Sequence, residues 1–191
     1  MPKRKKEEKT ICFEDCYKKE STNLETISIP PFEITNDDVL RLMSYFLHKA
    51  PNIESTHSKC IPREKHSDIF DKMFLDRHFI YVKICASNTN NEKNLFDGHL
   101  NGNTICLKCK RFVCKRKRTE KGDNSETDLE CFLRHIRNSI AHGRVYYLND
   151  KKRCYFVFED IRDNKVNTRI VCIKSDLEHW KKVLSCKQNY E

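Results

Sequence analysis

The segment FLRHIRNSIAHGRV, residues 132–145, contains side chains that can act on a phosphate group. His142 can exchange protons near neutral pH, and Arg137 can hold a phosphate through a fork of donors and stabilise the negative charge of a transition state. Asn138 can orient the imidazole or donate to the phosphate. If the substrate is RNA, the neighbouring 2′-hydroxyl supplies the nucleophile, so such a site needs no metal ion and no cofactor.

These side chains are expected at the end of a helix. Thr127 and Glu130 have the spacing of a capping box, which marks its start. Gly143 is suited to end it in a left-handed conformation, so His142 falls on the last turn. The apolar positions recur at helical intervals and form a core stripe that consists of Leu129, Phe132, Leu133, Ile136 and Ile140.

One such helix does not direct all three side chains to one point. Residues advance by about 100° around a helix, so Arg137 and His142 project about 140° apart, whereas Asn138 and His142 share a face. A second copy of the helix, packed antiparallel about a two-fold axis, would bring two arginines and two histidines into one cleft. The pattern therefore predicts a homodimer.

The composition favours a folded domain with a polyanionic partner. The chain has 37 Lys and Arg against 28 Asp and Glu, a formal charge of +9, with basic stretches at 1–9 and 108–122. Such charge attracts nucleic acid, although solvated basic loops are an equally good interpretation of these stretches. No export signal follows Met1 and no apolar run approaches the length of a membrane helix, so we expect a cytoplasmic protein with no membrane contact.

The remaining pattern predicts a mainly α protein. We expect a disordered basic tail at 1–10 and a single domain at 11–191, with a short helix near 12–17. Longer helices are expected near 35–50, 67–86, 127–142 and 175–184, of which 67–86 would be the most buried and 175–178 a second capping box. Three alternating, β-branched or aromatic runs between about 144 and 174 predict a small antiparallel β-meander before the last helix.

The segment LRHIRNSIAHGRV resembles the signature of the HEPN superfamily, in which an arginine, a polar residue and a histidine follow one another as Arg137, Asn138 and His142 do here. With the β-rich run containing FVFED and a final helix, residues 126–185 resemble plasmid- and phage-associated bacterial HEPN nucleases. The resemblance implies a helical bundle, a homodimer and a metal-independent endoribonuclease that leaves a cyclic phosphate and a 5′-hydroxyl.

It also implies a role in toxin–antitoxin systems or antiviral defence against phage, with an antitoxin or regulatory protein as a possible partner. By resemblance, Arg137 positions and stabilises the scissile phosphate, His142 transfers protons and Asn138 supports them. Arg134, His135 and Arg144 are predicted RNA contacts, with surface charge as the alternative for the arginines and a solvated or packing role as the alternative for His135. A non-catalytic HEPN module that binds RNA or protein is the second interpretation.

A cysteine cluster supports a third interpretation, a zinc-containing nucleic-acid-binding protein. CLKCKRFVC places Cys106, Cys109 and Cys114 in a basic stretch, and the first two have the spacing of a zinc knuckle. His99 or Cys131 would have to supply the fourth ligand. The alternative, which we favour, is that no metal binds: Cys106, Leu107 and Val113 then pack inside while Lys108, Lys110 and Arg111 face water.

Overall fold

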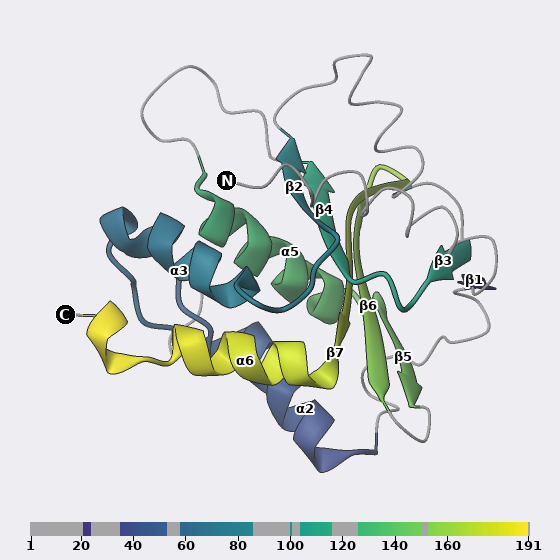
Figure 1. Ribbon diagram of the computed structural model, residues 1–191, viewed down its shortest axis with the longest axis horizontal. Coiled ribbons are helices and arrows are strands. Elements are labelled where there is room, and N and C mark those ends of the chain that lie inside the picture. The colour runs from purple at the N-terminus through teal and green to yellow at the C-terminus, as the bar shows by residue number, and fades with distance from the viewer. Residues whose placement is uncertain are drawn as a thin grey trace.

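The computed structural model describes residues 21–23, 35–52, 58–85, 100, 104–115, 126–149 and 153–190. In this part of the chain, helices cover one face of a five-stranded sheet (Figure 1). The helices are α2 (Asp37–Ser44), α3 (His66–Phe74), α5 (Asp128–Ala141) and α6 (Lys174–Leu184), with a π-helical turn at Tyr45–Lys49 and 3-10 turns at Arg63–Lys65 and Lys187–Asn189. Each of these helices is too short or too polar to span a lipid bilayer.

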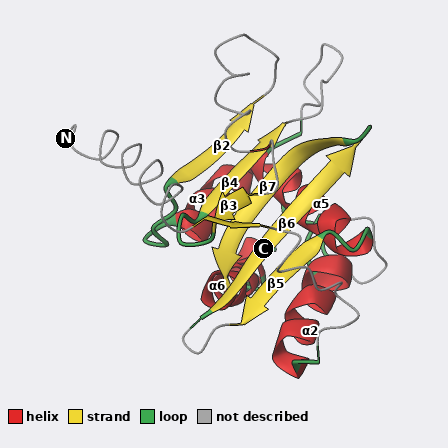
Figure 2. Cartoon of the chain, turned by 90° about the vertical axis from the view of Figure 1, so that its right-hand side faces the viewer, coloured by secondary structure: helices red, strands yellow, loops and turns green. Residues whose placement is uncertain are grey.

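The sheet has the strand order β2-β4-β7-β6-β5, which Figure 2 shows face-on. Its strands are β2 (Tyr81–Cys85), β4 (Arg111–Lys115), β5 (Val145–Asn149), β6 (Cys154–Arg162) and β7 (Lys165–Ile173). β2 runs parallel to β4 and the other pairs are antiparallel. β1 (Ser21–Asn23) and β3 (Thr104–Cys106) form a separate antiparallel pair.

The predicted β-meander is confirmed as β5, β6 and β7. The β6–β7 turn consists of Asp163 and Asn164, whose φ angles of 53° and 56° suit a two-residue hairpin. The expectation of a mainly α protein needs correction, because β4 and β2 extend the meander. The fold is mixed α/β: in the described residues, α2, α3, α5 and α6 pack on a four-stranded antiparallel sheet with β2 added in parallel at one edge.

The predicted helix at 67–86 is wrong in its second half. α3 ends at Phe74, and the backbone then adopts positive φ at Asp76 and His78, a conformation that a helix cannot contain. Residues 81–85 form strand β2 instead. A short apolar run fits a buried strand as well as a buried helix, so its periodicity could not separate the two.

The other predicted helices are found near their expected positions. Asn36 caps α2 by accepting from the Val39 N–H at 3.1 Å, and the π-helical turn that follows ends before Pro51. α6 begins at Lys174, where the Asp176 carboxylate accepts from the Ile173 N–H, so the capping box predicted at 175–178 is not formed. The predicted tail at 1–10 and the short helix near 12–17 lie outside the described residues.

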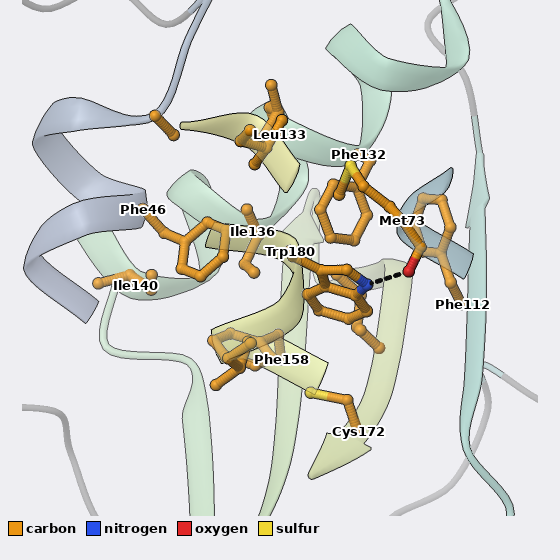
Figure 3. Close-up of a cluster of buried hydrophobic side chains, with 14 of the residues drawn as sticks. Phe46, Met73, Phe112, Phe132, Leu133, Ile136, Ile140, Phe158, Cys172 and Trp180 are labelled. Carbon is orange, nitrogen blue, oxygen red and sulfur yellow. Dashed lines mark hydrogen bonds between the residues drawn. The ribbon is translucent and has the colours of Figure 1, made fainter. Parts of the chain in front are cut away.

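The core lies between the helices and the sheet, and α5 is its central helix (Figure 3). Phe132 of α5 packs edge-on against Trp180 of α6 and Phe112 of β4, with ring centroids 4.9 and 5.2 Å apart. The Trp180 indole N–H donates to the Met73 carbonyl of α3 at 2.9 Å. These contacts fix α5 to both its neighbouring helices and the sheet.

Strand alternation assigns the residues of β6 to two layers. Phe156 and Phe158 point to the helices, whereas Tyr155 and Val157 belong to a second buried cluster on the opposite face. Residues of the β3 segment, Ile105 among them, cover that second face. The same alternation places Asp160 on the helix side of the sheet, opposite α5.

Candidate functional site at the end of helix α5

Helix α5 has a defined start. The Thr127 hydroxyl accepts from the Glu130 backbone N–H at 3.3 Å, and the Glu130 carboxylate accepts from the Thr127 N–H at 2.8 Å. The predicted capping box is therefore present, and it satisfies two backbone donors that a helix leaves unpaired.

The end of α5 is fixed equally well. The Arg144 N–H donates to the Ser139 carbonyl at 2.7 Å, and the Gly143 N–H donates to the Ile140 carbonyl at 3.1 Å. This is a Schellman motif, and it requires the φ of 65° that Gly143 adopts. His142 is the last residue before the glycine and its side chain is exposed, so a rigid helix end presents this imidazole to solvent.

Asp160 of β6 holds helix α5 against the sheet. Its Oδ2 accepts from His135 Nδ1 at 2.6 Å and from Asn138 Nδ2 at 3.1 Å. Burial works against the charged carboxylate, but these two hydrogen bonds keep the pKa of Asp160 below its usual value. Asn138 is thus anchored one helical turn before His142, on the face that the two residues share.

Sequence reasoning missed Asp160. The available signal was the pair Glu159–Asp160, which ends the apolar alternation of FVFED. Two adjacent carboxylates on a strand must face opposite sides, so one of them had to face the helices.

Arg134 and His135 belong to the same polar network. Arg134 donates to the Glu126 carboxylate at 2.5 and 2.9 Å and lies 3.2 Å from His135 Nε2. Burial opposes the charged carboxylate, but the hydrogen bond and charge of Arg134 lower the pKa of Glu126. His135 is only 2% exposed, so a direct contact with RNA would require its neighbours to move. The predicted RNA contacts of both residues stay predictions.

Helix geometry directs Arg137 and His142 to different sides of α5. Arg137 is partly buried and lies about 140° around the helix from His142, at about 100° per residue. Arg144 is exposed and follows the helix end directly; its carbonyl accepts from the Glu159 N–H at 3.0 Å, which ties this end to β6. The predicted homodimer, which would combine the two side chains across chains, stays a prediction.

The cysteines of CLKCKRFVC separate into two groups. The free thiols of Cys106 and Cys109 are hydrogen-bonded to each other, and this hydrogen bond is the main cause that lowers the pKa of Cys106 to about 6. Cys114 faces the helices, with its Sγ 3.3 Å from that of Cys131. Within the described residues the three cysteines therefore make no common metal site, and His99 lies outside those residues.

Arg111 explains part of this arrangement. The prediction that it faces water is wrong, because its side chain is fully buried and donates to the carbonyls of Cys106 and Cys109 at 3.1 and 3.0 Å. The guanidinium thereby stabilises the turn between Cys106 and Cys109 from inside the protein.

The family model described as HEPN pEK499 p136 matches residues 49–185, which is most of the chain and includes all of α3, α5, α6 and the sheet. No curated protein and no solved structure matches it.

Proposed function

Because the chain belongs to the HEPN pEK499 p136 family, we propose that it is an endoribonuclease that cleaves RNA without a metal ion in the reaction. HEPN domains are typically ribonucleases. The observation that carries the proposal is the helix end itself, where Arg137, Asn138 and His142 of the motif lie on the last two turns of α5. The exposed His142 imidazole is positioned by a rigid Schellman cap.

In the proposed reaction the 2′-hydroxyl of RNA attacks the adjacent phosphorus and the 5′-oxygen leaves. The products are a 2′,3′-cyclic phosphate and a 5′-hydroxyl, so no water is consumed. His142 takes the proton of the 2′-hydroxyl, and a proton reaches the leaving oxygen from solvent, so that each site uses one His142. Arg137 binds the non-bridging oxygens and stabilises the charge that builds up on them.

Asn138 and Asp160 act as positioning residues in this scheme. Asp160 accepts from the Asn138 amide nitrogen, which fixes the orientation of the amide group. The amide oxygen can then accept from an imidazole nitrogen of His142, one turn further along the same face. Such a bond would select the tautomer of His142 that takes up the proton.

The proposed enzyme is a homodimer with two copies of α5 facing each other across the RNA. Ala141 and His142 are exposed at the end of α5 and Arg137 and Asn138 are partly exposed, and the small Ala141 permits close approach of a second helix. Arg134 and Arg144 flank the site and are proposed RNA phosphate contacts. The biological setting we propose is bacterial: a toxin–antitoxin system or defence against phage.

Cleavage of RNA by purified protein tests the proposal. We expect the parent to cleave in EDTA and to leave cyclic phosphate ends, and Arg137→Ala and His142→Ala to lose activity by about a hundredfold or more. His48→Ala and Arg162→Ala are matched controls, because both side chains are exposed and lie outside the motif. Equal cleavage by the two motif variants would contradict the proposal, and RNA binding without cleavage by the parent would favour a non-catalytic module.

Mixed dimers test whether two chains share a site. Arg137→Ala and His142→Ala are each expected to be inactive alone. If the arginine and histidine of one site come from different chains, co-refolded mixtures retain one intact pair in some dimers and regain part of the activity. A mixture as inactive as either variant would contradict the shared site.

A further inference from the structure

A buried cluster of three metal-binding side chains lies beside the candidate site. Sγ of Cys114, Sγ of Cys131 and a ring nitrogen of His135 all lie within 4.8 Å of one another. The two thiols are fully buried and the imidazole is 2% exposed. The cluster joins β4, which carries Cys114, to α5, which carries the other two residues.

The contacts of His135 select the tautomer that a metal ligand needs. A carboxylate can only accept, so Nδ1 donates to Asp160 at 2.6 Å and carries the proton. This leaves the lone pair on Nε2, which accepts from Nη2 of Arg134 at 3.2 Å. The same Nη2 lies 3.9 Å from Cys131 Sγ, so a metal ion bound at Nε2 would take the place of this arginine donor. Metal-binding histidines are commonly oriented by a carboxylate in this way.

The separation of the two sulfurs fits a shared ion better than a disulfide. Cys114 Sγ and Cys131 Sγ are 3.3 Å apart. A disulfide bond is about 2.05 Å long. Two thiolates on one tetrahedral zinc ion, each about 2.3 Å from the metal, would be about 3.8 Å apart. A small outward movement of the thiols would therefore admit the ion.

We propose that Cys114, Cys131 and His135 together bind one zinc ion. Two thiolates and one neutral imidazole suit zinc, and the two negative charges balance the ion in a buried site. The fourth position is left to water or to the Glu126 carboxylate, which Arg134 holds beside the cluster. The ion links strand β4 to helix α5 and, through His135, fixes the position of the Asp160 carboxylate.

This site is separate from the proposed chemistry, in which no metal takes part. A buried ion leaves slowly, so a brief exposure to EDTA during a cleavage assay removes added divalent ions and leaves this one in place. The zinc content of the assayed sample is therefore measured together with its activity, which distinguishes failure of one proposal from failure of the other.

Metal analysis of the purified, reduced protein tests the proposal. We expect about one zinc per chain in the parent and less than about one tenth of that in Cys114→Ser and Cys131→Ser. Cys60→Ser, an exposed thiol, and Cys106→Ser, a thiol of the other group, are controls that keep their zinc. Asp160→Asn keeps all three ligands but removes the charged acceptor of His135 and Asn138, and it is expected to weaken zinc binding by roughly 10- to 100-fold.

Cobalt substitution of the parent supplies a test that does not depend on the folding of a variant. Thiolate coordination predicts a sulfur-to-cobalt charge-transfer band together with the visible bands of a tetrahedral ion. A parent that holds no zinc and shows no such spectrum with cobalt would overturn the proposal. So would zinc that stays in Cys114→Ser, or a Cys114–Cys131 disulfide in protein isolated without reductant.

Discussion

Glu159 and Asp160 are neighbours on strand β6, yet they serve opposite sides of the sheet. Glu159 points away from the helices and forms a buried ion pair with Arg169, at 2.5 and 2.6 Å. Asp160 points to the helices and binds His135 and Asn138 of α5. Adjacent residues of a strand point to opposite faces of the sheet. Glu159 therefore contacts a neighbouring strand, whereas Asp160, the next residue, contacts helix α5.

The two carboxylates also differ in which properties of the protein they are expected to affect. Both members of the Glu159–Arg169 pair are almost fully buried, at 3% and 1% exposed, so neither can be removed without leaving the other charge away from water. Asp160 is 9% exposed and its partners lie on another element. We therefore expect Glu159 to affect stability alone and Asp160 to affect stability, the zinc site and RNA cleavage.

The largest effect on stability is expected from breaking the Glu159 side. Arg169→Met leaves the Glu159 carboxylate buried without its partner, which should cost about 3–5 kcal/mol. Urea unfolding measures the loss, and the double variant with Glu159→Leu should recover much of it. Cleavage per folded molecule should stay at the parental level, and a selective loss of activity in folded Arg169→Met would contradict the division between the two faces.

A smaller loss is expected on the Asp160 side. Asp160→Asn removes a charged acceptor from His135 and Asn138 and should lower the free energy of unfolding by about 1.5–3 kcal/mol. Since Asn138 is then less well fixed, RNA cleavage should fall by about tenfold or more. Asp163→Asn, at the exposed hairpin, is the matched control. Unchanged cleavage in Asp160→Asn would remove Asp160 from the account of the site.

The same carboxylate predicts a pH dependence. Its pKa is lowered in the folded protein, so the unfolded chain takes up the proton first as the pH falls. The stabilisation is therefore complete above the ordinary aspartate pKa of about 3.9 and is lost below it. In urea titrations, the advantage of the parent over Asp160→Asn should shrink as the pH falls from about 5 towards 3; a constant difference would refute this assignment.

The smallest effect is expected at the helix end. Gly143→Ala places a side chain at a φ of 65°, and the added carbon meets nothing within 4 Å, so the cost comes from the backbone alone. We expect a loss of about 1 kcal/mol, with a smaller loss for Gly143→Asn. Thermal unfolding measures both. A Gly143→Ala variant as stable as the parent would contradict this cause.

The sequence predicted those parts of the molecule that depend on local chemistry. The capping box of Thr127, the left-handed Gly143 and the alternation of 144–174 each reflect rules that operate within a few residues. Strands β2 and β4 were missed because their pairing depends on β7, far away in the sequence.

Only those residues of the candidate site that lie within one helix could be predicted from the sequence. Arg137, Asn138 and His142 lie in one helix and could be recognised together. Asp160 and Cys114 reach that helix from strands β6 and β4, so their contacts appear only once the sheet is in place. Local spacing grouped Cys114 with Cys106 and Cys109, whereas strand alternation directs it to Cys131.

Cleavage of RNA by the end of α5 can be tested with total cellular RNA after induction of the parent and of His142→Ala at equal protein levels. We expect discrete cleavage of one or more RNA classes with the parent and intact RNA with the variant. Cleavage to the same extent with His142→Ala, or intact RNA with both at matched soluble levels, would contradict it.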